Sequence, residues 1–455
     1  MADTGGSAAA VYNERYARHA GRRHLSKPEP PTMDRPAAPD CTPENLAFDA
    51  ALAQVLRAVA PLPRCQSLAL EQALGRVLAQ PLIAGMDLQP WPNSAMDGYA
   101  FAAADADIAH QTGLRLAGTA LAGHPFTGTL ERGQCVRILT GAILPAGADT
   151  VAMQEHVTVH DGRVRLQRPV PPGANVRAPG EDVRAGQTVL PAGSRLGPPQ
   201  IALAAALGVR TVRVRARPRV ALFTSGDELT PPGQPLRPGA IYDSNRYLLR
   251  ALLQELGAEV VDLGSVADDP AAVRAAFAAA REGADVVVSS GGVSVGDADY
   301  VRDVFAEFGA IHFWRIAMKP GRPLAFGRLG DSWFFGLPGN PVSTAVTFHE
   351  FVRPALRRLE GETPTPALRL ELPLLEPLRK APGRLDFQRG IVAPGAHGRL
   401  GVRSAGAQGS HVMSSLAAAN CLLVLPADAG DLPAGTVVTV ELLPWPGTPT
   451  PSPGA

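Results

Sequence analysis

Hydrophobic positions near the start of the sequence recur with the period of a helix. They fall at Leu46, Phe48, Ala51, Leu52, Val55, Leu56 and Val59. This spacing predicts one helix over residues 43–61, and a similar pattern predicts a second over 68–78. After Pro90 the pattern changes to short apolar runs separated by Gly and Pro, which indicates a small β-rich domain up to about Pro179. Its predicted strands include 114–116, 135–139, 150–153 and 163–167.

From Arg219 onward, predicted strands and helices alternate. Asp243 and Asp269 occupy the N-cap positions of two helices, and Pro270 starts the second of them. In order, the predicted elements are 220–223, 244–256, 260–263, 270–281, 285–289, 298–308, 324–326, 333–335 and 342–359. Because parallel strands need long crossover connections, this alternation predicts a doubly wound parallel α/β sheet.

The last part of the sequence returns to short strands. They are predicted at 368–372, 390–392, 422–425 and 437–442, with one short helix at 413–419. This pattern predicts a small β-barrel or sandwich. Residues 1–42 and 446–455 are rich in Pro, Gly and small residues, so we expect both to be disordered. Four arginines among the first 23 residues leave an amphipathic targeting segment as the alternative for the N-terminal stretch.

Composition narrows the functional classes. The formal net charge of the 455 residues is +1, which gives no general electrostatic reason for binding nucleic acid or a membrane. The longest apolar runs fall far short of the roughly 20 residues that a membrane-spanning helix needs. The four cysteines are scattered, which argues against a disulfide framework or a cysteine-based zinc site and favours a cytoplasmic location.

Unusual residues gather at the predicted carboxyl ends of three strands. The loops that follow these strands are 224–228, 290–299 and 336–343. Ligands of open parallel sheets bind at this edge, and glycines there allow the backbone to approach an anion such as a phosphate closely. The acidic residues of the region, Asp227, Glu228, Asp243, Asp297 and Asp299, suggest Mg²⁺, with helix capping as the alternative role.

Three cations lie within the segment 315–322, at Arg315, Lys319 and Arg322. They form a candidate oxyanion clamp, and a solvated charge cluster is the alternative. The chain has only three lysines, and Lys319 is the one in this segment. A lysine kept in a chain that otherwise uses arginine indicates a need for a compact point charge. Neither a Walker A motif nor a G-x-G-x-x-G motif is present, which weakens the nucleotidase and dinucleotide-binding interpretations.

Seven short motifs together resemble one family. They are N-S-A-M-D-G-Y-A (93–100), R-I-L-T-G-A (137–142), G-E-D (180–182), S-G-D-E-L (225–229), S-S-G-G-V-S-V-G-D-A-D-Y (289–300), M-K-P-G-R-P (318–323) and G-L-P-G-N-P-V-S (336–343). Their order is similar to that in the MoeA family of molybdopterin molybdenumtransferases, to which the E domains of gephyrin and Cnx1 are related. The resemblance covers about residues 43–445.

The resemblance implies four domains. They are a split helical domain (43–85 and 180–216), an inserted β-rich domain (86–179), an α/β molybdopterin-binding domain (217–361) and a C-terminal β-barrel (362–445). It also implies a homodimer whose cleft joins the α/β domain of one subunit to the N-terminal domains of the other. The implied reaction inserts molybdate into adenylylated molybdopterin and releases AMP, with Mg²⁺ as cofactor.

The resemblance assigns roles by motif position. The implied catalytic residues are Asp97, Thr140, Asp182, Asp268, Arg315 and Lys319, and the implied Mg²⁺ ligands are Glu228 and Asp299. The implied substrate-binding residues are Gly291, Gly292, Ser294, Arg322, Pro338, Asn340, Ser343 and Arg389. Lys319, Arg322, Ser343 and Arg389 correspond to the molybdate-contacting set. Many family members carry Lys where this chain has Arg315 and Arg322, which replaces a point charge by a planar bidentate donor.

Two other functional classes remain at this stage. A molybdopterin adenylyltransferase shares the α/β fold and performs the preceding step, but that module is typically the α/β domain alone. Such an adenylyltransferase is also a candidate partner that hands over the substrate. A non-catalytic scaffold of the gephyrin type is the other class, and the intact cleft motifs argue against it.

Overall fold

The protein is described here by a computed structural model that covers residues 45–292, 300–364, 367–395 and 398–447. The extension predicted for residues 1–42 and most of the tail predicted for 446–455 lie outside the described residues. Three predicted site residues, Ser294, Asp297 and Asp299, also lie outside them. No helix of the described part is long and apolar enough to cross a membrane.

The α/β region is built on a six-stranded sheet with the order β16-β13-β17-β21-β20-β18. The strands are β13 (Arg219–Ser225), β16 (Glu259–Val266), β17 (Val286–Ser290), β18 (Gly309–Arg315), β20 (Pro323–Leu329) and β21 (Ser332–Leu337). The first four strands in this order are parallel, which confirms the predicted doubly wound arrangement. The parallel prediction is wrong for β20, which runs antiparallel to both neighbours. Only two residues, Gly330 and Asp331, connect β20 to β21, and so short a loop can join only antiparallel strands.

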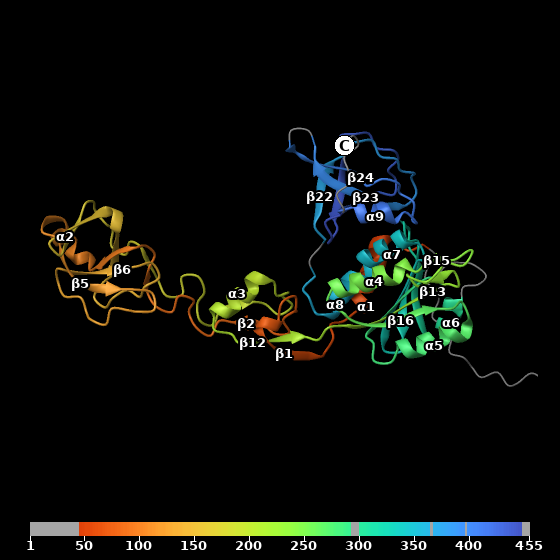
Figure 1. Ribbon diagram of the computed structural model, residues 1–455, viewed down its shortest axis with the longest axis horizontal. Coiled ribbons are helices and arrows are strands. Elements are labelled where there is room, and N and C mark those ends of the chain that lie inside the picture. Colours follow the sequence, from red (N-terminus) through yellow and green to blue (C-terminus); the bar gives the residue numbers. More distant parts are fainter. Residues whose placement is uncertain (1–44, 293–299, 365–366, 396–397, 448–455) are drawn as a thin grey trace, which may run out of the picture. The chain divides into compact units, whose positions relative to one another are not determined.

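Helices cover both faces of this sheet (Figure 1). They are α4 (Ser244–Glu255), α5 (Pro270–Ala280), α6 (Tyr300–Phe308), α7 (Pro341–Thr347), a π-helical segment η4 (Phe348–Val352) and α8 (Arg353–Leu359). Alternate residues of β13 point to opposite faces, as a strand requires. Val220 and Leu222 pack in one core with α4, α7 and α8, whereas Ala221 and Phe223 pack in another with α5 and α6.

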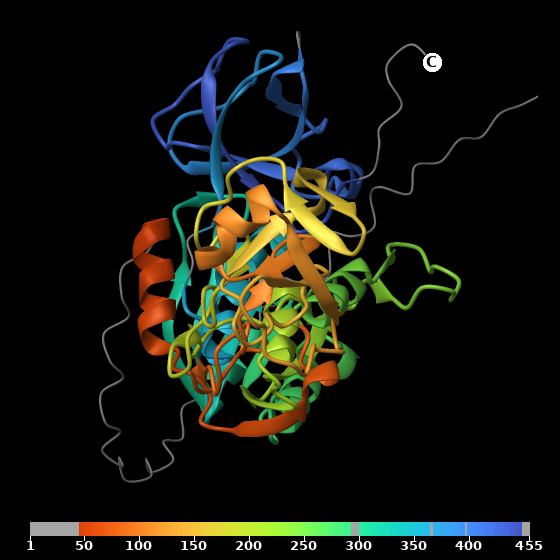
Figure 2. The same ribbon diagram turned by 90° about the vertical axis from the view of Figure 1, so that its left-hand side faces the viewer.

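The first predicted helix is confirmed in a shorter form, as α1 (Phe48–Ala58). It is the orange-red helix at the left of Figure 2, and it contacts α8 and η4. The ring of Phe48 lies 5.3 Å from that of Phe351 and 5.2 Å from that of Phe387, measured between centroids. These buried aromatic contacts place α1 in the same core as α4, α7 and α8.

The helix predicted over 68–78 is wrong. Its residues form β1 (Cys65–Ala69) and a 3-10 turn η1 (Leu70–Gln72), and Gly75 then has a positive φ of 74° that interrupts any helix. β1 pairs antiparallel with β12 (Thr211–Arg215). A second antiparallel pair also joins distant segments: β2 (Leu82–Ile83) pairs with β11 (Thr188–Leu190). The buried apolar residues of these strands pack with α3 (Pro198–Ala206).

The segment between β2 and β11 forms a second six-stranded sheet, in the order β7-β4-β6-β5-β9-β8. Its strands are β4 (Gly98–Phe101), β5 (Leu114–Ala120), β6 (Gln134–Ile138), β7 (Thr150–Met153), β8 (Val157–His160) and β9 (Arg163–Leu166). A short helix, α2 (Ala106–Gln111), and the pair β3 (Asn93–Ser94) with β10 (Val176–Arg177) complete this region. The prediction of a β-rich region here is confirmed.

The C-terminal region is a β-barrel. Its strands are β22 (Arg369–Pro373), β23 (Leu385–Pro394), β24 (Leu400–Ser404), β25 (Cys421–Leu425) and β26 (Val437–Leu442), joined at one end by β19 (Met318–Lys319). A bridge between Leu374 and Val402 links the end of β22 to β24, which closes the sheet. The predicted short helix is present as α9 (Met413–Ala418).

Asp243 fixes α4 against the sheet. Its buried carboxylate accepts hydrogen bonds from Thr224 Oγ1 (2.5 Å), Ser265 Oγ (2.7 Å) and the backbone N–H of Arg246 (3.1 Å). One side chain therefore caps α4 and ties β13 to β16 at the edge where the parallel strands end.

We predict that Asp243→Ala lowers the free energy of unfolding by about 3 kcal/mol, because it removes a cap and leaves the buried Thr224 hydroxyl without its carboxylate acceptor. Asp269→Ala is the matched control. Asp269 caps α5 through Ala272 N–H alone and is exposed, so its loss should cost about 1 kcal/mol. Urea unfolding of both variants measures the difference, and equal losses would contradict the role given to Asp243.

Candidate active site

The ends of the parallel strands meet as the sequence predicted. Ser290 Oγ donates a hydrogen bond to the carbonyl of Pro338 (2.9 Å) and accepts one from Asn245 Nδ2 (2.9 Å). The same Asn245 amide donates to the carbonyl of Gly339 (2.7 Å). The loops after β17 and β21 and the first turn of α4 are thus joined by direct hydrogen bonds.

Gly291 and Gly292 lie where no side chain fits. Both have positive φ angles, of 93° and 63°. A Cβ atom at Gly291 would lie 2.2 Å from the carbonyl oxygen of Ser225, and one at Gly292 would lie 2.3 Å from Val301 Cγ2. The backbone after β17 is therefore pressed against the end of β13, and the N–H of Gly291 donates to the carbonyl of Leu337 on β21 (3.3 Å). Because neither glycine has a side chain, a ligand can approach this backbone closely.

Several buried polar atoms beside these glycines have no hydrogen-bond partner among the described residues. They are Ser225 Oγ, Ser289 Oγ and Asn245 Oδ1. Buried polar groups are normally paired, so a cluster of unpaired ones at one sheet edge is typical of a site that a polar ligand completes.

Three carboxylates follow the neighbouring strands β13 and β16. The backbone N–H of Asp268 donates to Asp227 Oδ1 (3.1 Å). Burial raises the pKa of Asp268 above its ordinary value, and the negative charges of Asp227 and Glu228 raise it further. Asp227 and Glu228 are exposed. The region therefore has oxygen ligands with an excess of negative charge.

The cation segment lies between the α/β sheet and the barrel. Lys319 pairs through β19 with Asp386 on β23, and its Nζ atom lies 3.5 Å from Asp386 Oδ2. The lysine side chain is 48% exposed, whereas the aspartate side chain is 4% exposed. Gln388 Nε2 donates to the same aspartate oxygen (3.1 Å). Asp386 thus forms an ion pair with an ammonium group that is still half exposed to solvent.

The turn after Lys319 contacts α7. A Cβ atom at Gly321 would lie 2.4 Å from Thr347 Cγ2 and 3.7 Å from the carbonyl oxygen of Ser343. Ser343 is buried near the start of α7, which Asn340 begins as its exposed N-cap. Arg322 Nε donates to Asn45 Oδ1 (3.0 Å). The structure therefore brings the predicted Lys319–Arg322 segment next to Ser343.

Arg389 lies apart from the exposed cations. It is 1% exposed, and its guanidinium donates to the carbonyls of Ala407 (2.9 Å), Gln408 (3.3 Å) and Gly409 (2.9 Å) and to Ser415 Oγ (3.2 Å). Burial lowers its pKa to about 10. The side chain fixes the segment before α9, so an anion could reach it only by displacing these bonds.

Asp97 and Thr140 form a second group, on the sheet that contains β4 and β6. Asp97 Oδ1 accepts hydrogen bonds from both the backbone N–H and the hydroxyl of Thr140, each of 2.8 Å. These bonds, with a smaller contribution from Arg137, lower the pKa of the Asp97 carboxyl. Asp182 is exposed just before β11. Arg315 is half-buried at the end of β18, and its carbonyl accepts a bond from Leu46 N–H (3.1 Å).

Sequence reasoning missed three residues that shape the site, namely Asn245, Asp386 and Asn45. Asn245 had a usable signal, because it lies two residues after the helix cap Asp243 at the predicted sheet edge. Asp386 and Asn45 contact Lys319 and Arg322 across 67 and 277 positions of the chain, and no local pattern reports such distant pairs.

We predict that Gly291→Ala destabilises the protein by about 3 kcal/mol or more, because it adds a clash with the Ser225 carbonyl to the cost of a positive φ. Gly264→Ala is the control in the same sheet. Gly264 has a φ of 87° but open space around it, so only the conformational cost of about 1–2 kcal/mol applies. Denaturant melts compare the two, and a Gly291 variant no worse than the control would refute the close approach.

Comparison with known proteins agrees with this geometry. Three family models match the chain: the MoeA N-terminal region (domain I and II) at residues 46–208, a probable molybdopterin binding domain at 221–358, and the MoeA C-terminal region (domain IV) at 371–443. The molybdopterin molybdenumtransferase of Haemophilus influenzae is 41% identical over 400 residues, which cover 87% of this chain and 98% of that protein.

Further relatives extend the likeness. Molybdopterin molybdenumtransferase 2 of Mycobacterium tuberculosis is 36% identical over 398 residues, or 86% of this chain and 96% of that protein. The crystal structure of the molybdopterin biosynthesis moeA protein from Pyrococcus horikoshii aligns with a TM-score of 0.77 at 28% identity, over 88% of this chain and all of that one. The chain therefore belongs to the MoeA family of molybdopterin molybdenumtransferases.

Proposed function

We propose that the protein inserts molybdate into adenylylated molybdopterin and releases AMP, the last step of molybdenum cofactor biosynthesis. The observation that carries the proposal is that two features lie beside one segment, 338–343: a side-chain-free strand edge at Gly291 and Gly292 next to Gly339, and a cation segment next to Ser343. The first suits a phosphate group and the second suits an oxyanion.

The adenylyl end of the substrate binds at the strand edge in this proposal. The backbone at Gly291 and Gly292 approaches the pyrophosphate, and Pro338 and Asn340 line the neighbouring loop. The exposed carboxylates of Asp227 and Glu228 fit Mg²⁺, which is typically held by one or two carboxylates together with phosphate oxygens and water. Bound Mg²⁺ would neutralise the phosphate charge there, with Glu228 as a ligand and Asp268 beside it.

Molybdate is held at the cation segment. Lys319 and Arg322 supply positive charge, and Ser343 supplies a hydroxyl at the start of α7. Asp386 lies 3.5 Å from Lys319 Nζ and holds the half-exposed ammonium at the border of the barrel. Arg389 supports this site indirectly, because it fixes the segment 407–409. This role differs from the direct molybdate contact that the resemblance implies.

The proposal extends to a cytoplasmic homodimer with shared clefts. Asp97, Thr140 and Asp182 belong to the N-terminal regions, while Arg315 and Lys319 belong to the α/β region and its border with the barrel. We assign both groups to one reaction, each cleft taking the first group from one subunit and the second from its partner. The four-domain division at residues 85, 179, 216 and 361 is part of this proposal.

The adenylyltransferase alternative is not favoured, because matches to MoeA N-terminal and C-terminal regions flank the molybdopterin-binding domain. The scaffold alternative is disfavoured by the unpaired buried polar atoms at the strand edge, which a structural role does not require. The direct test supplies purified protein with adenylylated molybdopterin and follows AMP. Release that depends on molybdate supports the proposal, and consumption of ATP with unmodified molybdopterin would replace it by the adenylyltransferase.

We predict that Lys319→Ala leaves the fold intact but lowers molybdate-dependent AMP release by about 100-fold or more, because it removes the charge that holds the oxyanion. Arg399→Ala is the control, since Arg399 is an exposed cation of the barrel. Its activity should match the wild type. A Lys319 variant with full activity at limiting molybdate would remove the clamp from the mechanism.

The shared cleft makes a separate prediction through subunit mixing. Asp97→Ala and Lys319→Ala proteins, each inactive alone, are exchanged at equal ratio. Half of the dimers become heterodimers, and each heterodimer then has one cleft with both lesions and one with neither. Roughly a quarter of wild-type activity should return. If exchange is verified by mass spectrometry and no activity returns, each cleft is built within one chain.

A further inference from the structure

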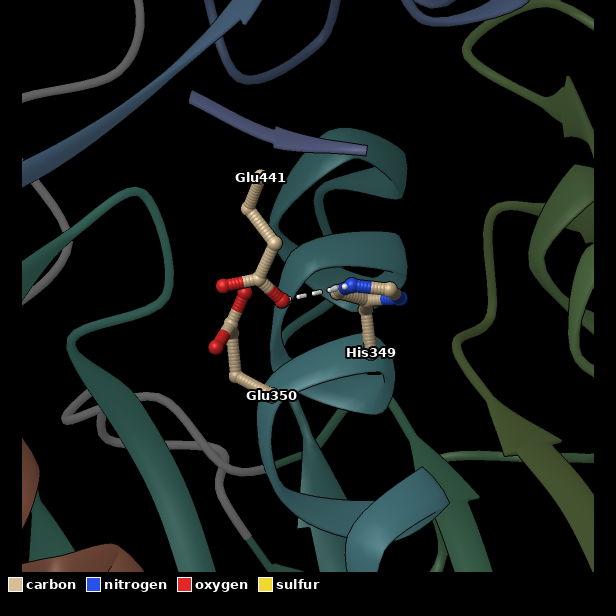
Figure 3. Close-up of side chains that lie close together, drawn as sticks. All are labelled: His349, Glu350 and Glu441. Atoms are coloured by element: carbon tan, nitrogen blue, oxygen red, sulfur yellow. Dashed lines mark hydrogen bonds and ion pairs between the residues drawn. The ribbon is translucent and has the colours of Figure 1, made fainter. Parts of the chain in front are cut away.

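A buried cluster of metal-ligand side chains lies outside the candidate active site (Figure 3). It consists of His349 and Glu350 on the π-helical segment η4 and Glu441 on β26 of the barrel. All three residues are buried, and a ring nitrogen and one oxygen of each carboxylate lie within 4.8 Å of one another. The cluster joins two regions that are distant in sequence.

The π-helical turn explains how adjacent residues share one target. In an α-helix, consecutive side chains diverge by about 100°, so His349 and Glu350 would face different neighbours. The wider turn of η4 reduces this divergence, and both side chains point at Glu441 in Figure 3. Such local π-helical turns are frequent at functional sites because they re-aim side chains in this way.

Within the described part of the chain, the hydrogen bonds of the cluster leave one carboxylate oxygen without a donor. Glu441 accepts from His349 Nε2 (3.0 Å) and from Arg369 Nε (3.1 Å). Glu350 is only 4% exposed, and its Oε1 atom has no hydrogen-bond partner among the described residues. Two facing buried carboxylates cannot both stay ionised unless a proton or a cation lies between them.

The donor set identifies the class of cation. One imidazole nitrogen and two carboxylate oxygens suit zinc and its first-row neighbours, whereas Mg²⁺ and Ca²⁺ prefer oxygen ligands alone. We propose that His349, Glu350 and Glu441 form a binding site for a zinc-class divalent ion, which fastens η4 to the last strand of the barrel. The ion takes the place between the carboxylates, and three protein ligands leave a further position for water.

Arg353 sets the strength of this site. Its Nη1 atom lies 3.3 Å from His349 Nδ1, so the ring nitrogen that faces Glu441 carries the imidazole proton. Metal binding at Nε2 moves that proton to Nδ1, which then faces a guanidinium donor instead of an acceptor. Arg353 therefore opposes the ion both by charge and by hydrogen bonding, and a glutamine at this position offers an acceptor in its place.

The experiment uses the full chain, freed of metal with a chelator and titrated with Zn²⁺ alone. We expect Zn²⁺ to raise the melting temperature, as any ligand of the folded state does, and zinc-edge anomalous diffraction to give a peak between His349, Glu350 and Glu441. The peak position separates this site from zinc bound at the acidic residues Asp227, Glu228 and Asp268. No peak inside the cluster at saturating Zn²⁺ would overturn the proposal.

The zinc affinities of three variants give a second, independent test. Glu350→Gln should weaken zinc binding by more than about 100-fold, because even residues that only orient a ligand contribute 10–100-fold. Arg353→Gln should instead strengthen it by about tenfold. Glu282→Gln, at an exposed glutamate far from these elements in sequence, should change nothing.

The same variants test the alternative, in which the two carboxylates share a proton and bind no metal ion. A glutamine at position 350 donates its amide hydrogen to Glu441 and mimics the protonated acid. If a shared proton is all that the cluster holds, Glu350→Gln keeps its stability and zinc affinity does not respond to either substitution. If Glu350→Gln fails to fold, the diffraction peak in the wild-type protein and the Arg353→Gln affinity still decide the question.

Discussion

The structure depends on the close contact between the ends of β13 and β17. The backbone at Gly291 lies so near the Ser225 carbonyl that no Cβ atom fits between them. Because of this contact, the ends of β13 and β17 converge, and Ser290 and Asn245 tie the end of β17 to the loop after β21 with direct hydrogen bonds. A parallel sheet provides such an edge, but only glycine fits at this position, and its lack of a side chain lets a ligand approach the backbone closely.

Charge is arranged around this edge in two opposite groups. Carboxylates follow β13 and β16, and burial, together with the negative charges of Asp227 and Glu228, raises the pKa of Asp268. Cations lie on the segment between β18 and β20, where the barrel contributes Asp386 as the partner of Lys319. The barrel is therefore part of the proposed site, since Asp386 pairs with Lys319 and Arg389 fixes the segment before α9. The proposed zinc-class site at His349, Glu350 and Glu441 fastens the same barrel to the end of the α/β region.

The sequence predicted those features that depend on local patterns or short motifs. Strand and helix alternation after Arg219 and the caps at Asp243 and Asp269 follow local rules, and the structure confirms them. The helix predicted over 68–78 was wrong because pairing of β1 with β12, about 140 residues away, outweighed its helical period. The contacts Lys319–Asp386 and Arg322–Asn45, and the π-helical turn that aims Glu350, arise only from tertiary packing.

The central claim is that the strand edge and the cation segment form one binding site for the two substrates. Crystals of the protein grown with AMP and molybdate test it most directly, with diffraction recorded at the molybdenum edge. The account predicts an anomalous peak beside Lys319 and Ser343, with the phosphate of AMP against Gly291 and Gly292. AMP bound at the glycines with molybdate only at distant surface positions would contradict it, and so would molybdate at Lys319 with AMP bound elsewhere.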